Sequence, residues 1–154
     1  MRFETRSQED TAQFGRALGG MLRPGDTVLL SGELGTGKSV LARGIARALG
    51  VEGAMPSPSF TIMIPHEGRV SVCHLDLYRL EDEDEFFAAG LEECFDGKNV
   101  CLVEWPEMAG IDPRPNVAAH LARVAGEENR RLIVLEERGV ALDAAKLAPW
   151  RANG

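Results

Sequence analysis

Helices are predicted where apolar residues recur every three or four positions along the chain. The first such pattern covers residues 12–22 and follows Ser7, a good N-cap residue, with two acids suited to a first helical turn. A second pattern covers residues 38–49, and Gly50 is a natural residue to end it. A third helix is predicted over residues 81–91, which begin with an acidic block.

Short apolar runs between these helices predict strands. The runs 28–31 and 100–104 are almost wholly apolar, as expected for strands buried inside a sheet. Runs 60–65 and 69–75 are joined by three residues, 66–68, that include a glycine, which predicts an antiparallel hairpin. The remaining strand-like segments are an edge strand at 1–6 and a closing pair at 116–124 and 130–135, joined by a turn at 126–129.

A phosphate-binding motif lies between the strand at 28–31 and the helix that follows it. Residues Gly32 to Ser39 read GELGTGKS and match G-x-x-x-x-G-K-[ST] without a mismatch. The glycines allow turns that direct successive backbone N–H groups inward, Lys38 is suited to the β- and γ-phosphates, and the Ser39 hydroxyl is suited to Mg²⁺. The residues expected to bind the nucleotide here are Glu33, Leu34, Gly35, Thr36, Gly37, Lys38, Ser39 and Val40.

These elements predict an α/β protein of the P-loop NTPase type. Its three-layer fold is expected to hold a central parallel sheet, with antiparallel strands added at the edges. The length of 154 residues is typical of one domain. We assign that domain to residues 1–137, and residues 138–154 to a C-terminal tail that contains a short helix.

Two acids follow predicted strands, at the sheet edge where doubly wound folds bind ligands. Asp76 is suited to hold Mg²⁺ directly or through water, and Glu104 completes a Walker B-like pattern. His74 is either a packed, hydrogen-bonded residue or a group that orients water. Trp105 either packs in the core, stacks near the nucleotide or signals its presence. Together with Lys38 the two acids are the expected catalytic residues, and the general base remains open between Asp76, His74 and Glu104.

Two further segments are candidates for contact with the nucleotide. The proline-rich linker 51–59 is either a plain connection or a switch segment, with the hydroxyls of Ser57, Ser59 and Thr61 within reach of the metal. Arg130 and Arg131 begin the last strand, and one of them is expected at the nucleotide; we assign Arg130, with a solvated surface position as the alternative.

Composition excludes several other classes of protein. The net charge of −7 and the lack of a Lys/Arg-rich run argue against a primary nucleic-acid or membrane-surface binder. No apolar run approaches about 18 residues, and the N-terminus is too polar for a signal peptide. The three cysteines, Cys73, Cys94 and Cys101, have no metal-binding spacing and are expected to be buried, reduced thiols of a cytoplasmic protein.

Four separated stretches, taken together, closely resemble the bacterial TsaE (YjeE) family. They are GELGTGKS from Gly32, SPSFT from Ser57, HLDLYRL from His74 and VEWPE from Val103. The resemblance runs from about Ser7 to Leu135, and its HLDLYRL and EW parts are the most specific.

The resemblance implies an accessory ATPase for threonylcarbamoyladenosine formation beside the anticodon of tRNA. Such a protein binds the TsaB–TsaD pair and resets it by hydrolysing ATP with Mg²⁺, is a poor ATPase alone, and meets tRNA only through the complex. Matched by motif, the family's functional residues are Lys38, Ser39, Glu104, Asp76, Tyr78 and the loop at Ser57, with Ser7 and Thr11 near the adenine. Ser39 and Ser59 stand where threonine is common, and both keep the hydroxyl.

Two other functions are considered beside this one. A small-molecule P-loop kinase would need a cationic lid, and no Arg-rich segment lies between Glu104 and Arg130, where Arg114 and Arg123 are isolated. A nucleotide-dependent regulatory module with little turnover is not separated from the accessory ATPase by sequence.

Overall fold

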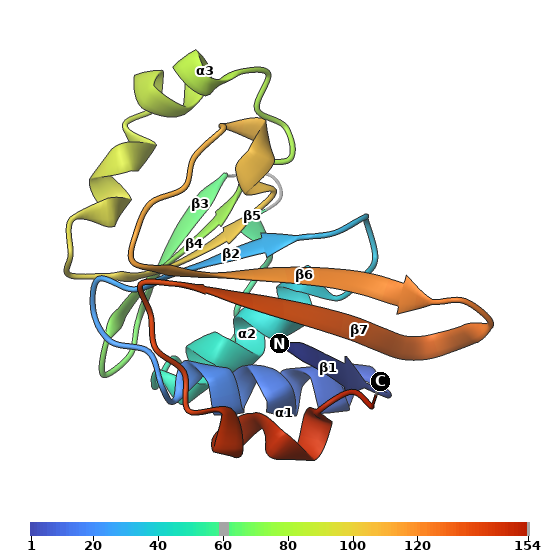
Figure 1. Cartoon of the computed structure of the whole chain (residues 1–154). Coiled ribbons are helices and arrows are strands. Elements are labelled where there is room, and N and C mark those ends of the chain that lie inside the picture. The colour runs from blue at the N-terminus through green and yellow to red at the C-terminus, as the bar shows by residue number, and fades with distance from the viewer. Residues whose placement is uncertain (59–61, 154) are drawn as a thin grey trace.

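A seven-stranded sheet forms the centre of the computed structural model, which describes residues 1–58 and 62–153. The strand order is β1-β7-β6-β2-β5-β4-β3. The four central strands β6, β2, β5 and β4 are parallel, whereas β1, β7 and β3 add antiparallel pairs at the two edges (Figure 1). The strands are β1 (Arg2–Thr5), β2 (Thr27–Ser31), β3 (Met63–Glu67), β4 (Ser71–Asp76), β5 (Val100–Glu104), β6 (Asn116–Val124) and β7 (Glu127–Arg138).

The strands β2, β4 and β5 bury residues on both faces, whereas β6 buries one face and leaves His120 on the other exposed. In β2, Val28 and Leu30 point into one apolar cluster and Leu29 into another, and β5 divides its residues in the same way. Helices α1 (Gln8–Gly19) and α2 (Lys38–Ala48) cover the first face, and the segment around α3 (Glu83–Ala88) covers the second (Figure 1). The predicted three-layer α/β fold with antiparallel edges is therefore confirmed.

Helices α1 and α2 pack closely because glycines line their contact. A Cβ on Gly15 would lie 2.7 Å from the Leu41 carbonyl oxygen, and a Cβ on Gly19 would lie 2.6 Å from that of Ile45. The predicted N-cap is also present, since the Ser7 hydroxyl accepts a hydrogen bond from the Asp10 amide at 3.0 Å. The glycine contacts between the helices bring the start of α1 close to the start of α2.

The covering segment on the second face differs from the prediction. A single helix was expected over residues 81–91, but α3 ends at Ala88, and Gly90 adopts a left-handed φ of 73°. A separate 3-10 helix, η2 (Leu91–Phe95), follows. Phe86, Leu91 and Cys94 still enter the same apolar cluster, so the break redirects the chain across the sheet.

Two predicted connections are shifted in the structure. The β3–β4 hairpin turns at residues 68–70, because the Arg69 amide donates to the Leu49 carbonyl and docks the turn on the end of α2. The turn between β6 and β7 was placed at 126–129, but β7 already starts at Glu127, which pairs with Val124.

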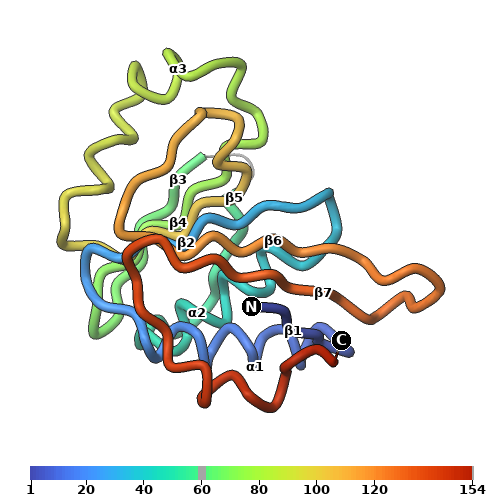
Figure 2. Tube along the Cα trace, viewed as in Figure 1, coloured from blue at the N-terminus to red at the C-terminus, as the bar shows by residue number. Residues whose placement is uncertain are grey.

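The C-terminal segment folds back onto α1. It contains the 3-10 helix η4 (Ala144–Trp150), and the Trp150 ring meets Phe14 edge-on at 5.5 Å. Trp150 also donates to the Asp10 carboxylate at 2.8 Å, and Arg151 forms a bridge to Phe3. The N- and C-termini therefore lie on the same side of the molecule (Figure 2). Among residues 1–58 and 62–153, no helix has the length and apolar character needed to cross a membrane.

Candidate nucleotide-binding site

The loop between β2 and α2 has the backbone shape that its glycines allow. Gly32, Gly35 and Gly37 all have positive φ values, of 135°, 75° and 103°. At Gly32 there is also no room for a side chain, because a Cβ would collide with the Leu121 carbonyl oxygen. The N-terminus of α2 follows directly, so its unpaired amide groups face the space enclosed by the loop.

All five carbonyl groups from residue 32 to residue 36 accept hydrogen bonds from side chains. Lys38 Nζ donates to Gly32 at 2.6 Å and to Glu33 at 2.8 Å, and the Thr36 hydroxyl also donates to Glu33 at 2.9 Å. The Leu34 carbonyl accepts from Arg123 on β6, and the carbonyls of Gly35 and Thr36 accept from Arg131 on β7. Because the C=O and N–H of a trans peptide point in opposite directions, these bonds turn the loop amides away from the donors.

Lys38 is held inside the protein although it carries a charge. Its residue is only 5% exposed, and its ammonium lies 4.2 Å from the centre of the Trp105 ring. Burial lowers the pKa of Lys38 below its usual value, against the opposing effect of the nearby Glu104, Glu107 and Asp76 carboxylates. Phosphate oxygens in the loop would offer this ammonium a stronger partner than two neutral carbonyls.

Glu104 connects the loop to the end of the sheet. Its buried carboxylate accepts from the Ser39 hydroxyl at 3.0 Å and lies 2.6 Å from His74 Nε2. Asp76 ends the neighbouring strand β4, in register with Glu104, and lines the same cleft as Lys38 and Ser39.

This donor set fits Mg²⁺. Mg²⁺ in P-loop sites is bound by one or two protein oxygens, several waters and the phosphates, not by a complete protein cage. Ser39 and Glu104 supply two such oxygens at one point, and Asp76 is close enough to the cleft to act through water. Within the described part of the chain, no three His, Cys, Asp or Glu side chains form a cluster that could bind a metal alone.

An aromatic pair forms the wall beside Lys38. The rings of Tyr78 and Trp105 lie 4.8 Å apart, and Tyr78 is exposed. Trp105 has a left-handed φ of 59°, an unusual and strained conformation for a bulky residue. Its amide donates to the Leu30 carbonyl at 3.1 Å, which helps to hold this turn next to Glu104.

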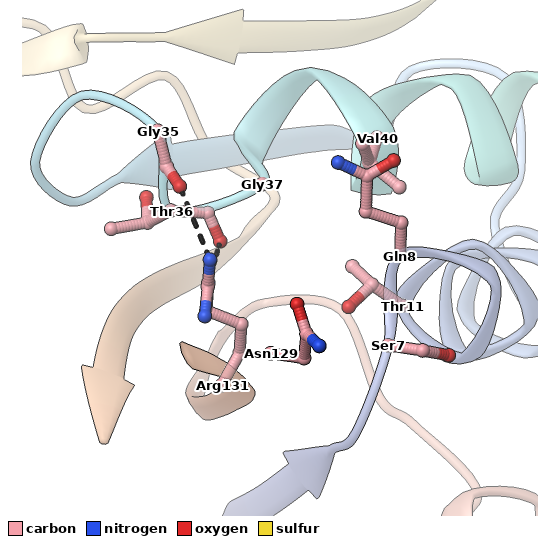
Figure 3. Close-up of a pocket in the computed structure, with 9 residues that line it drawn as sticks. All are labelled: Ser7, Gln8, Thr11, Gly35, Thr36, Gly37, Val40, Asn129 and Arg131. Carbon is pink, nitrogen blue, oxygen red and sulfur yellow. Dashed lines mark hydrogen bonds between the residues drawn. The ribbon is translucent and has the colours of Figure 1, made fainter. Parts of the chain in front are cut away.

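A second hollow lies on the other side of the loop, between α1 and β7 (Figure 3). In Figure 3, side chains from the start of α1 face the loop across this hollow, and Arg131 reaches up to the loop from β7. The hydroxyls of Ser7 and Thr11 already have partners, Asp10 and Thr5, so both also stabilise α1. The lining residues are Ser7, Gln8, Thr11, Gly35, Thr36, Gly37, Val40, Asn129 and Arg131.

The structure places Arg131, and not Arg130, beside the loop. Arg130 forms ion pairs with Glu4 and Glu127 instead. The reason is the alternation of a strand: Arg131 shares its face of β7 with the buried Ile133, on the side covered by α1 and α2, and Arg130 points to the opposite face. The assignment of Arg130 to the nucleotide site is therefore corrected.

The other predicted residues are exposed or lie outside the described part of the chain. The Glu33 side chain is almost fully exposed and lies 3.8 Å from Arg123. Ser57 is exposed, on the linker that follows α2. Ser59 and Thr61 of the predicted switch loop fall outside the described residues.

Sequence reasoning missed Gln8, Asn129 and Arg123. Gln8 could have been considered, because it directly follows Ser7 at the helix start that was assigned to the nucleotide. Arg123 was regarded as isolated, yet it donates to the loop from 89 positions away in sequence, a contact that no local signal encodes.

Comparison with known proteins identifies the family. The family model for "Threonylcarbamoyl adenosine biosynthesis protein TsaE" matches residues 5–133, most of the chain. The chain belongs to the TsaE family. A TsaE relative from Treponema pallidum is 38% identical over 135 residues, which are 87% of this chain and 99% of the relative.

Other TsaE proteins agree with this. The relative from Bacillus subtilis is 34% identical over 140 residues, covering 90% of this chain and 79% of its own length. The crystal structure of YdiB from Bacillus subtilis superposes with a TM-score of 0.75 at 28% identity, covering 90% of this chain and 86% of YdiB. The family and fold thus place this chain in tRNA threonylcarbamoyladenosine biosynthesis, as a P-loop protein suited to bind a nucleotide.

Proposed function

We propose that this TsaE protein binds and hydrolyses ATP with Mg²⁺ in order to reset the TsaB–TsaD complex between rounds of tRNA threonylcarbamoylation. The observation that carries the proposal is the junction of the loop with the sheet. There the Ser39 hydroxyl and the buried Glu104 carboxylate meet at 3.0 Å, next to a buried Lys38. A phosphate cradle, a lysine and a pair of metal-binding oxygens are the parts that phosphoryl transfer to water requires.

The residues would divide the work as follows. Lys38 exchanges the carbonyls of Gly32 and Glu33 for phosphate oxygens, which are stronger acceptors. Ser39 and Glu104 would hold Mg²⁺, with Asp76 acting through water, and the ion would supply neutralisation of the charge that develops on the phosphates. His74, at 2.6 Å from Glu104, keeps that carboxylate oriented towards Ser39.

Hydrolysis by the chain alone is expected to be slow. Ser39 and His74 both bond to Glu104, and Lys38 bonds to the loop's own carbonyls. These groups satisfy one another and must rearrange before they act on a nucleotide. A partner that favours the rearranged state would raise the rate, since a ligand shifts an equilibrium by its difference in affinity for the two states. In this account the chain does not itself transfer the threonylcarbamoyl group, and it meets tRNA only through the complex.

The test is ATP hydrolysis by the purified chain, alone and with TsaB, TsaD and tRNA. Slow hydrolysis that rises with the partners, and is lost in Lys38→Ala, is expected. Phosphorylation of a small metabolite without partners would instead support a P-loop kinase. Tight ATP binding without hydrolysis under any of these conditions would support a regulatory module.

A further inference from the structure

Arg123 and Arg131 bind the outer side of the phosphate-binding loop through hydrogen bonds to its carbonyl groups. Arg123 Nη2 donates to the Leu34 carbonyl at 2.6 Å. Arg131 donates through Nε to Thr36 at 3.1 Å and through Nη2 to Gly35 at 3.4 Å (Figure 3). Three consecutive carbonyls of the loop are thus bound by guanidinium groups that belong to the β6–β7 hairpin.

The placement of these two arginines has an electrostatic cost that the loop offsets. Arg123 and Arg131 are directly opposite each other in the antiparallel β6–β7 pair. Like charges in such a position destabilise a sheet. Here each guanidinium points at backbone carbonyl oxygens, whose partial negative charge compensates for that repulsion.

The contact of Arg123 with the loop also depends on Gly35. Arg123 Nη2 comes so close to Gly35 that a Cβ there would lie 2.6 Å from it. Gly35 therefore serves two purposes: it allows the left-handed φ of 75°, and it leaves room for the guanidinium.

A bound nucleotide would make the hydrogen bonds from Arg123 and Arg131 to the loop more important. In the structure Lys38 satisfies the carbonyls of Gly32 and Glu33, and it would leave them for phosphate. Arg123 and Arg131 do not depend on that exchange. They would remain on the outer carbonyls and keep the amides of the same peptides directed inward, towards the phosphates.

We propose that Arg123 and Arg131 are positioning residues that hold the loop in its anion-binding shape before a nucleotide arrives. This inference rests on the proposed nucleotide binding and extends it, because it assigns the preorganisation of the loop to a cross-strand arginine pair. Preorganisation of this kind improves affinity by lowering the ordering cost of binding.

The first test needs no nucleotide. Backbone ¹⁵N order parameters of residues 35–37 are measured by NMR relaxation in the whole chain and in the variants Arg123→Gln, Arg131→Gln and both together. Lower order parameters in each variant, and the lowest in the double variant, are expected. Arg138→Gln is the matched control, since Arg138 lies on β7 but pairs with Asp112 and Glu136.

The second test measures the dissociation constant of Mg·ADP by calorimetry in the same proteins. Each single variant is expected to bind about five- to tenfold more weakly, which is less than the full effect of a lost charge-assisted hydrogen bond, because the arginines contact the loop and not the nucleotide. The thermal midpoint should change no more than it does in Arg138→Gln. Lysine at either position should recover only part of the affinity, because it cannot reproduce the planar fork of arginine.

The outcomes separate the two proposals. Unchanged order parameters in the loop would overturn the role of the arginines, whether or not ADP binds. Lower order parameters in a protein that binds no ADP would support that role and contradict the proposed nucleotide binding. Lower order parameters with unchanged affinity for ADP would show that the arginines do not preorganise the site.

Discussion

The contact between α1 and α2 gives the sharpest stability prediction. At Gly15 an added Cβ would lie 2.7 Å from the Leu41 carbonyl oxygen, 3.1 Å from the Ile45 nitrogen and 3.2 Å from the Gly44 Cα. Ordinary contact begins at 3.4 Å, so Gly15→Ala requires the two helices to separate by about 0.7 Å. All three obstacles are backbone atoms, which cannot rotate out of the way.

The expected cost follows from two opposing effects. Overpacking of this kind costs roughly 2–3 kcal/mol where the neighbours are rigid. Alanine in a helix recovers about 1 kcal/mol relative to glycine. The net destabilisation is therefore about 1–2 kcal/mol, or a thermal midpoint lower by roughly 2–8 °C in a domain of this size.

Thermal and urea unfolding of Gly15→Ala and of a control, Gly20→Ala, check this value. A Cβ on Gly20 would meet nothing closer than 3.6 Å, and its φ of −64° suits alanine, so the control should be as stable as the wild type or slightly more stable. Equal midpoints for the two variants would refute the packing argument. Because Gln8 and Thr11 lie on α1 and line the hollow beside the loop, Gly15→Ala should also weaken nucleotide binding.

Three further predictions concern the thiols and the aromatic wall. A hydrogen bond with Cys101 and burial raise the pKa of Cys73 from 9.0 to about 11. The protonated Cys73 thiol therefore stabilises the fold fully below pH 9.0, and this stabilisation is lost as pH rises through about 11. Across this window the free energy of urea unfolding should fall less in Cys73→Ala than in the wild type. Cys94, whose pKa is also raised by its hydrogen bond with Cys73 and by burial, should resist iodoacetamide in the native protein and react in urea, as mass spectrometry would show. In a Trp150→Phe background, ATP should change the fluorescence of Trp105, because the Lys38 ammonium would leave the Trp105 ring for the phosphates. Lys38→Ala should remove that response.

Local sequence patterns were sufficient for the parts of the site that lie in one motif or at the end of a buried strand. The loop, Lys38 and Ser39 lie within one strand–loop–helix unit, and Glu104 and Asp76 end buried strands that the apolar runs identify. The parallel centre of the sheet brings these strand ends to one edge. For this reason the acids could be placed beside the loop before the structure was known.

Contacts between distant segments could not be predicted in the same way. The choice between Arg130 and Arg131 depended on which face of β7 is covered, and the buried Ile133 on the same face could have settled it. The bond from Arg123 to Leu34 depends on the pairing of β6 with β2 and has no local signal. The shifted β3–β4 turn depends likewise on its docking against the end of α2, through the Arg69 amide.

The most direct test of the account counts how many tRNAs each TsaB–TsaD complex modifies. In a reconstituted reaction with ATP, threonylcarbamoyl donor and excess tRNA, the wild-type chain should support many rounds per complex. With Lys38→Ala, or with a non-hydrolysable ATP analogue, modification should stop after a single round, because the complex is not reset. Continued rounds at the wild-type rate with Lys38→Ala would contradict the claim that ATP hydrolysis at this loop drives the cycle.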